Sequence, residues 1–399
     1  MSAEIGTMPP QRQRETRDSI LTNPQVRSAV IQIVLVGGLA LFVWWLVGNT
    51  ADNLRNANIA SGFGFLQTRA GFDISQVPIS YTSGSTYGHA ILVGIANTLI
   101  VAGTGIIFAT ILGFLIGIGR LSRNFLIRGL STVYVETFRN IPSLLVMLFW
   151  YFGVLSVLPL PRQAIELPFD SFLSNRGLQT PSAIFGPGAW VTLVALIVGL
   201  VATIVLSKIF KRRQLATGQR PSLMLPALGL IVLLPIVVFA ASGFPATLDL
   251  PQRGTFNLTG GFQIKPEFLA IFLALSVYTA SFIAEIVRAG IMSVSKGQTE
   301  AASALGLRRN LSLRLVVVPQ AFRVIIPPLT SQYLNLTKNS SLGLAIGYPD
   351  LVAVGSTVLN QSGQSIEVVV IWMSVYLGIS ITVSIVMNWF NRRMKLIER

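Results

Sequence analysis

The sequence contains no cysteine and only one histidine, His89. Without cysteine there is no disulfide and no thiolate to act as nucleophile or metal ligand, and a single histidine argues against a histidine-based metal site. Charge is also scarce, because 11% of the residues are Asp, Glu, Lys or Arg, against about a quarter in a soluble domain. A water-soluble fold of 399 residues could not cover its surface with so few charges.

Uncharged apolar runs take the place of the missing charge, and each is long enough to cross a bilayer. The hydrocarbon core needs about 20 apolar residues in helical form. Strands would leave open edges in lipid, whereas a helix satisfies its own backbone. We therefore predict an all-α integral membrane protein with eight transmembrane helices. The predicted spans are 29–48, 90–119, 131–158, 189–207, 222–243, 268–289, 313–336 and 368–391.

Positive charge is distributed unevenly around these spans. All but seven of the 30 lysines and arginines fall in the terminal segments and in the loops that share a side with them. Because positive segments stay cytoplasmic, both termini are predicted to be cytoplasmic. The basic residues separate apolar runs and form no stripe, so the net charge of +15 does not indicate nucleic-acid binding. For 342–359 two placements remain, a half-helix entering from outside or a segment outside the bilayer.

The segment between the sixth and seventh spans carries a motif with definite spacing. Glu300-Ala301-Ala302 is followed after three residues by Gly306, and nine further residues lead to Val316–Pro319. We predict a short helix over 297–305 that places Ala301, Ala302 and Leu305 on one small face suited to a groove of another protein. Glu300 offers a charge to a basic partner.

The residues after this helix are expected to turn the chain toward the seventh span. Gly306 permits the turn, and Ser312 is predicted to cap the next helix. In the second span, Gly113, Gly117 and Gly119 suit close approach of another helix.

The motif resembles the EAA loop of bacterial ABC import permeases, with valines where that pattern has isoleucine and leucine. Three further stretches resemble polar amino-acid permeases of the histidine, glutamine and general L-amino-acid group, namely 134–153, 278–307 and 334–347. The resemblance implies a type I importer permease core made of the second, third, sixth, seventh and eighth spans. It also implies that the loop couples to an ATPase through Glu300, Ala301, Ala302, Leu305 and Gly306.

The same resemblance implies a function and a set of partners. The chain would be the permease subunit of an importer that moves L-amino acids from periplasm to cytoplasm through the bacterial inner membrane. Its partners would be a homologous permease, two copies of an ABC ATPase and a periplasmic amino-acid-binding protein. No G-x-x-x-x-G-K-[ST] motif is present, so ATP and Mg²⁺ are expected on the partner ATPase and no catalysis in this chain.

The expected domain organisation follows from this core. The chain divides into a cytoplasmic basic tail, an extra helix with a periplasmic segment, the permease domain and a cytoplasmic C-terminus. A helix pair with its loops, at about 159–265, is inserted into the permease domain. The boundaries are 1–28, 29–88, 89–391 and 392–399.

Polar residues inside the membrane are candidates for a substrate path, because their burial is costly. After a helix expected to be broken at Pro327 and Pro328, the segment 335–341 supplies a cation and several oxygen acceptors for an amino acid. We predict irregular backbone there, facing the sixth span. The candidate path residues are Tyr278, Thr279, Asn335, Lys338, Asn339 and Ser340. In the alternative interpretation, Lys338 extends to the outer headgroups.

The sequence also contains two charged pairs and leaves one alternative function open. Glu285 with Arg288, and Glu136 with Arg139, have the spacing of salt bridges along a helix. An ion-coupled secondary transporter is the alternative function. It would require isolated acids at the middle of helices, which the sequence does not contain, and no internal repeat supports it.

Overall fold

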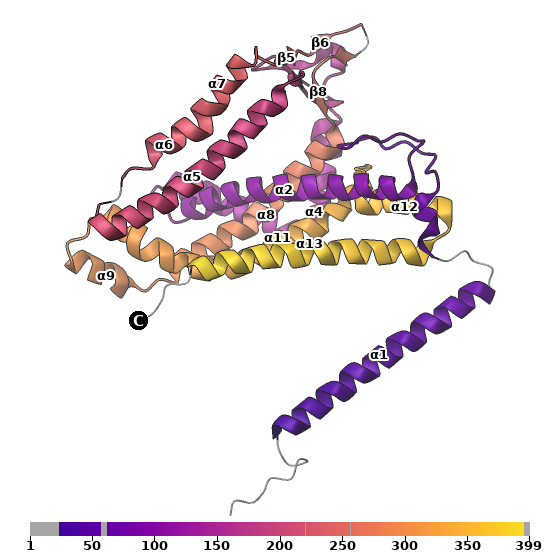
Figure 1. The fold of residues 1–399 in the computed structure, drawn as a ribbon, viewed down its shortest axis with the longest axis horizontal. Coiled ribbons are helices and arrows are strands. Elements are labelled where there is room, and N and C mark those ends of the chain that lie inside the picture. The colour runs from indigo at the N-terminus through magenta and orange to yellow at the C-terminus, as the bar shows by residue number, and fades with distance from the viewer. Residues whose placement is uncertain (1–23, 57–61, 220, 256, 395–399) are drawn as a thin grey trace, which may run out of the picture.

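The computed structural model describes residues 24–56, 62–219, 221–255 and 257–394. Most of the predicted basic tail and the last five residues therefore lie outside the described residues. In the described part, seven helices are long and apolar enough to cross a membrane, and one bent helix pair would make an eighth. Seven of the eight predicted spans are confirmed on length and composition, and the bent pair occupies the place of the third; Figure 1 shows the arrangement.

The long apolar helices follow the predicted spans closely. Two of them contain π-helical turns, at Gly229–Leu233 and Leu313–Val317, and one ends in the 3₁₀ turn Ser340–Ile346. Their bounds are α1 Pro24–Asn56, α2 Tyr87–Gly119, α5 Ala189–Thr217, α6 Met224–Leu228 continued by α7 Leu234–Ala241, α8 Pro266–Met292, α10 Arg309–Ser312 continued by α11 Val318–Asn339, and α13 Ser365–Met394.

The predicted continuous third span, 131–158, is wrong. The chain forms α3, Phe125–Asn140, and then α4, Ser143–Leu148, which runs on as a π-helical turn to Leu155. The two parts are bent by 108°. The break falls at Ile141, whose φ of −103° and ψ of 132° are extended, because Pro142 disfavours the helical conformation in the residue before it.

Helix α8 lies at the centre of the bundle, and its closest neighbour is α2. Of the spans, α8 is buried most, with 61% of its apolar window inside the fold. Gly113 and Gly117 of α2 lie directly against Ile283 and Ala284 of α8. The predicted close approach is therefore confirmed, and α8 is the helix that these two glycines admit. Gly119 lies against Ser131 of α3 instead.

The segment 342–359 packs within the bundle and does not turn back on itself as a half-helix. It contains the end of the 3₁₀ turn and most of α12, Leu351–Ser362, which packs on α2. Its contacts approach the start of α2 in order, since Pro349 O accepts from Asn97, Leu351 lies against Gly94, and Tyr87 OH donates to Gln361. Helix α12 therefore continues the direction of α11 and is not a separate span.

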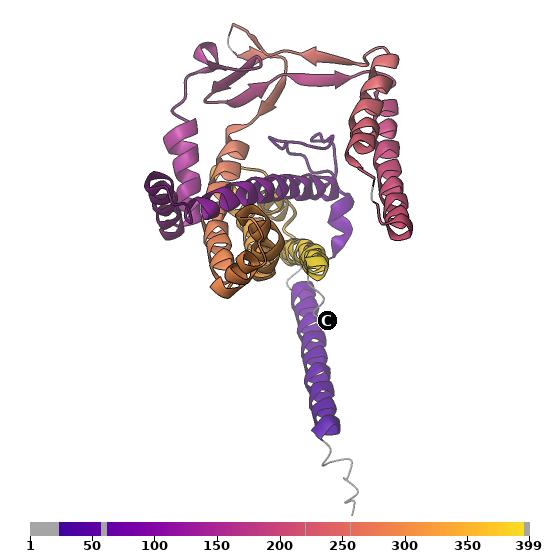
Figure 2. The same ribbon diagram turned by 90° about the vertical axis from the view of Figure 1, so that its left-hand side faces the viewer.

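The loops of the inserted segment contain short strands, which the all-α prediction did not include. A four-stranded antiparallel sheet has the order β1-β2-β3-β8, with β1 Ile165–Leu167, β2 Ser171–Ser174, β3 Gly177–Thr180 and β8 Phe262–Ile264. Two-stranded sheets pair β4 Ser182–Phe185 with β5 Ala246–Asp249, and β6 Gln252–Arg253 with β7 Leu258–Thr259. Strands before α5 thus pair with strands after α7. Figure 2 shows them at the top, where they join the helical hairpin formed by α5 and α6–α7 to the bundle.

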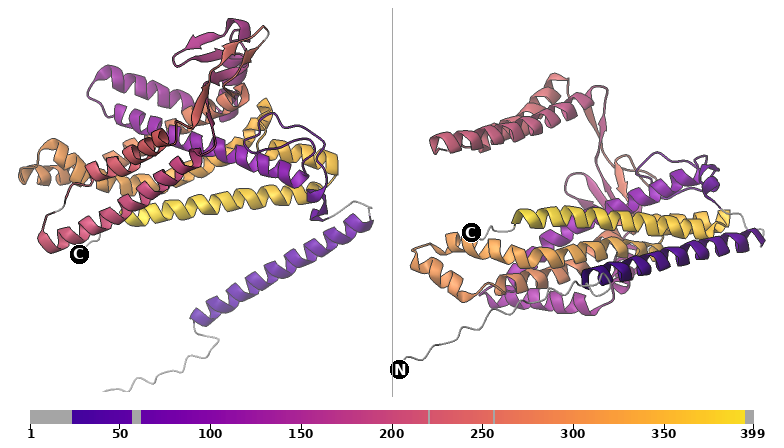
Figure 3. Two further views of the ribbon diagram at one scale, coloured as in Figure 1. Left: turned by 45° about the horizontal axis from the view of Figure 1, so that its top comes forward. Right: turned by 60° about the horizontal axis from the view of Figure 1, so that its bottom comes forward.

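The segment after α1 covers the end of the bundle at which α2 begins. Gly62 N donates to Glu367 Oε1 of α13 at 2.6 Å. The buried side chains of Phe65 and Ala70 join a second core with residues of α2, α12 and α13. Helix α1 itself stands away from the bundle, as Figures 1 and 2 and the left-hand view of Figure 3 show.

Candidate functional site

The predicted loop helix is confirmed as α9, Lys296–Ala304. Gly306 follows with a φ of +76°, a conformation that glycine adopts without a steric cost. Its N–H donates to Ser303 O, and Leu307 N donates to Ala302 O. Both hydrogen bonds belong to a Schellman ending. The glycine therefore ends the helix and directs the chain toward α10, as the sequence predicts.

The predicted common face of α9 is wrong in one residue. Ala302 is 3% exposed and is the buried side chain of this helix. Leu305 is 81% exposed, and Glu300 and Ala301 are exposed with it. Because α9 packs against the π-helical turn before α11, Ala302 anchors the helix to its own chain. The surface available to a partner is formed by Glu300, Ala301 and Leu305.

Ser312 does not cap the next helix. The helix begins earlier, after Arg308 with its extended backbone, and Ser312 is a buried residue in the last position of α10. The helix continues through the π-helical turn into α11 without interruption. A further link ties α9 to α11, since Gln320 Nε2 donates to Gln298 Oε1 at 3.1 Å.

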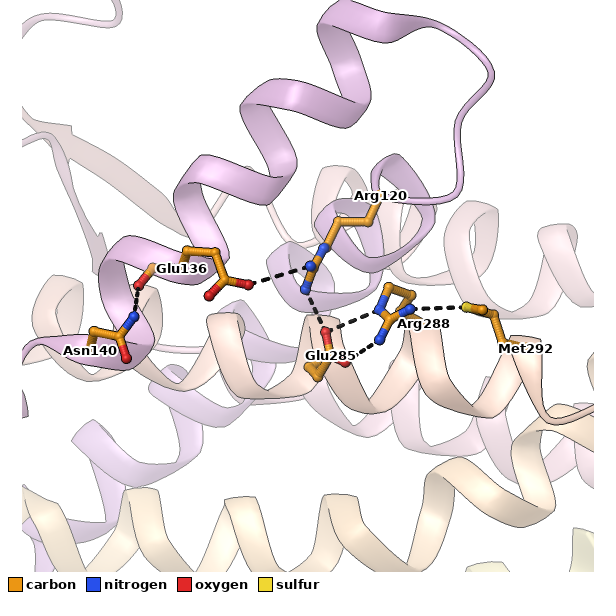
Figure 4. A network of polar contacts seen from close by, with 6 residues as sticks. All are labelled: Arg120, Glu136, Asn140, Glu285, Arg288 and Met292. Atoms are coloured by element: carbon orange, nitrogen blue, oxygen red, sulfur yellow. Dashed lines mark hydrogen bonds and ion pairs between the residues drawn. The ribbon is translucent and has the colours of Figure 1, made fainter.

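A network of charges joins three helices near the same end of the bundle (Figure 4). Arg120 follows the last residue of α2 and forms an ion pair with Glu285 of α8. Arg288 donates to the same carboxylate from Nε at 3.1 Å, so the predicted pair of Glu285 and Arg288 is confirmed. Arg120 also lies 3.5 Å from Glu136 of α3.

The second predicted pair has a different partner. The ion pair of Glu136 is with Arg120, whereas the guanidinium of Arg139 lies 5.5 Å above the ring of Phe282 on α8. Both contacts attach α3 to the central helices. The periodicity of one helix could not reveal them, because the partners come from α2 and α8.

The candidate path residues are divided between several surfaces. Asn335, Lys338 and Asn339 lie within the continuous helix α11, which contains Pro327 and Pro328 without breaking. The prediction of irregular backbone is therefore wrong. Ser340 is buried, and its hydroxyl donates to Thr337 O. Asn335 and Lys338 are exposed.

Lys338 borders a hollow of about 320 Å³ at the surface of the bundle. It is lined by residues of α11, the 3₁₀ turn, α12 and α13, namely Lys338, Ser341, Val352, Trp372, Met373 and Tyr376. Tyr278 and Thr279 do not line it. Thr279 is buried in α8, and the Tyr278 ring lies 5.0 Å from that of Phe282. Lys338 therefore lies apart from the two candidates on α8, Tyr278 and Thr279.

Lys338 lies near the middle of the bundle along its length. Leu336, two residues before it, lies against Gly105, close to the middle of the 33-residue helix α2. In the described part of the chain, no carboxylate forms an ion pair with Lys338.

A buried polar cluster beside this hollow holds the start of α12 in place. Asn97 and Thr98 of α2 form its hydrogen bonds to this region, because Asn97 Nδ2 donates to Pro349 O at 2.9 Å and Leu351 N donates to Thr98 Oγ1 at 3.0 Å. Sequence reasoning missed Asp350, whose Oδ1 accepts from Ala353 N at 2.8 Å. The Pro-Asp pair before an apolar run was the available signal for this N-cap.

The sequence is similar to several known proteins along almost its whole length. Residues 221–396 match the family described as binding-protein-dependent transport system inner membrane component. The chain is 61% identical over 381 residues to the general L-amino acid transport system permease protein AapQ of Rhizobium johnstonii, covering 96% of this chain and 95% of that protein. It is 50% identical to the putative amino-acid ABC transporter permease protein YhdX of Escherichia coli, covering 94% and 96%. It is 42% identical to the glutamate/glutamine/aspartate/asparagine transport system permease protein BztB of Rhodobacter capsulatus, covering 95% and 96%.

Proposed function

The chain belongs to the inner membrane components of binding-protein-dependent transport systems and is a multi-pass permease subunit of an ABC importer for amino acids. On this premise we propose that it moves L-amino acids inward across the bacterial inner membrane, with both termini cytoplasmic. A second homologous permease, two copies of an ATPase that holds ATP and Mg²⁺, and a periplasmic binding protein complete the complex. An impermeant thiol reagent applied from outside should label Thr255→Cys and not Ser303→Cys.

Helix α9 is proposed as the contact with the ATPase. The observation that carries this proposal is the exposure of Leu305, at 81%, on a short helix held rigidly by the buried Ala302 and by the Schellman ending at Gly306. An apolar side chain presented in this way on a fixed helix fits a groove of another protein. Glu300 adds a charge beside it.

Leu305→Asp should separate the ATPase from the permease. A carboxylate placed in an apolar groove would be desolvated without a partner, so we expect a loss of at least about tenfold in retained ATPase. The measurement is the amount of ATPase that co-purifies with the membrane complex, together with ATP hydrolysis stimulated by substrate. Leu215→Asp is the matched control, because Leu215 is equally exposed at 81% and lies in the last turn of α5. Full stimulated hydrolysis by the Leu305 variant would refute the assignment of α9.

The hollow beside Lys338 is proposed as part of the substrate path. Its volume, about 320 Å³, suits one amino acid. Lys338 supplies a cation for the carboxylate of the substrate, and the aromatic rings of Trp372 and Tyr376 can face its ammonium. Because the hollow lies at the surface of this chain, the partner permease would close it. Tyr278, Thr279, Asn335, Asn339 and Ser340 stay predictions that need separate tests.

Lys338→Gln should reduce transport by about tenfold, since one charge-assisted hydrogen bond contributes roughly 1.5 to 3 kcal/mol. The loss should be larger for acidic than for basic amino acids. The measurement is uptake per ATP hydrolysed in reconstituted complexes with saturating binding protein. Lys338→Arg should retain most uptake because it keeps the charge. Equal rates for wild type and Lys338→Gln across both classes would place the path elsewhere.

A further inference from the structure

The helical hairpin formed by α5 and α6–α7 packs mainly against itself. Among the described residues, the close contacts of α5 are with α6, α7 and the π-helical turn between them. Only 11% of the apolar window of α5 and none of that of the second arm is buried. Figures 2 and 3 show the hairpin standing apart from the bundle, attached through the strands. A surrounding other than this chain must therefore cover most of its surface.

The hairpin carries a dense positive charge at the end away from the strands. Lys208, Lys211, Arg212 and Arg213 lie within the last three turns of α5, and all four are exposed. No acidic residue occurs between Asp170 and Asp249 in the sequence. Within the described residues, none of the four forms an ion pair. This charge is therefore free to meet anions supplied from outside the chain.

Large apolar side chains lie beside these cations. Leu215 is 81% exposed, and Met224 and Leu225, at the start of the second arm, are 77% and 74% exposed. The uncharged part of α5, from Ala189 to Ser207, is about 28 Å long at 1.5 Å per residue. That length matches the hydrocarbon core, so the cations begin where the headgroups begin. Basic and apolar side chains mixed at this depth are typical of segments that lie in the lipid interface.

We propose that Lys208, Lys211, Arg212 and Arg213 form a binding site for the headgroups of anionic phospholipids, with Met224 and Leu225 inserted among the acyl chains. The site anchors the inserted hairpin, which has little support from the bundle. Lys208, Lys211 and Arg212 share one face of α5 by their 3–4 spacing and can hold one phosphate between them. A lipid surface is favoured over a protein partner because the exposed apolar side chains lie at membrane depth and the charge has a single sign.

The site is tested on the assembled complex by the lipid that it retains. The variant Lys211→Gln with Arg212→Gln should retain at least about fivefold less phosphatidylglycerol after purification in detergent, because each basic side chain near an anionic surface contributes roughly fivefold to binding. Retained phosphatidylethanolamine, which has no net charge, should not change. Lipid extraction followed by mass spectrometry gives both quantities.

Two further variants complete the test. Arg392→Gln with Arg393→Gln removes the same charge from α13, where Arg393 lies 4.0 Å above the ring of Trp389, and should leave the retained phosphatidylglycerol unchanged. Lys211→Arg with Arg212→Lys keeps both charges and should retain the wild-type amount. Equal losses in the α13 and α5 variants would overturn a dedicated site. Unchanged lipid with loss of the ATPase would show that the cluster binds protein.

Discussion

Gly113→Val should leave little folded permease in the membrane. A Cβ atom at Gly113 would lie 2.6 Å from both Cβ and Cγ2 of Ile283 and 3.0 Å from the backbone oxygen of Ala280. Two of these neighbours cannot move away by rotating a side chain. Helices α2 and α8 would therefore have to separate along the most buried contact of the bundle, at a cost of about 3 kcal/mol.

The measurement for Gly113→Val is the monodisperse fraction and the thermal midpoint of the purified protein. Gly103→Val is the matched control, because Gly103 lies in the same helix with no atom within 4 Å of the added Cβ. It makes the same change in helix propensity and hydrophobicity. We expect the control to behave as wild type. Equal stability of the two variants would mean that α2 and α8 are not packed as closely as the structure places them.

Glu285→Gln is expected to produce the second large effect. The Glu285 carboxylate forms ion pairs with Arg120 and Arg288, and the side chain of Arg120 is only 12% exposed. Removal of the acid leaves one nearly buried cation and one partly buried cation without their main partner. Breaking such a pair costs several kcal/mol when it is fully buried, and about 2 to 4 kcal/mol is expected for this partly exposed group.

A double-mutant cycle separates the pair from the individual residues. Arg120→Met alone leaves Glu285 with Arg288, and the double variant Arg120→Met with Glu285→Gln leaves no nearly buried cation unpaired. We expect the double variant to be more stable than Glu285→Gln alone, measured by thermal unfolding in detergent. Additive losses would show that Arg120 and Glu285 do not interact. Substrate-stimulated ATP hydrolysis of the same variants would show whether the network also transmits motion from α9.

Most predictions that rest on a local signal were confirmed. The cap at Ser312 was not, and the prediction of a continuous third span did not use the local signal of Pro142. The eight apolar runs become helices because a backbone in lipid has no other way to satisfy its polar groups. Helix α9 and its turn follow from the small residues around Ala301 and from Gly306, whose positive φ needs no distant partner. The family also followed from the sequence, because the spacing of the EAA motif is itself a one-dimensional pattern.

The contacts between segments were decided only in the tertiary structure. The apolar run of 342–359 gave no sign that α12 would be held by Asn97 and Thr98 of α2. The spacing of residues in α9 placed Ala302 and Leu305 on one face. In the structure, packing against the π-helical turn buries Ala302, and Leu305 stays exposed.

The physical reason is the same in each case. Composition and spacing determine whether a segment lies in lipid and whether it is helical, since both depend on the segment alone. Close packing between residues far apart in the chain decides which face of a helix is buried. It also decides which carboxylate forms an ion pair with Arg120. The sequence alone therefore determined the membrane class, all but one of the spans and the family. The tertiary structure decided the exposed surface of α9, the surroundings of Lys338 and the isolation of the basic hairpin.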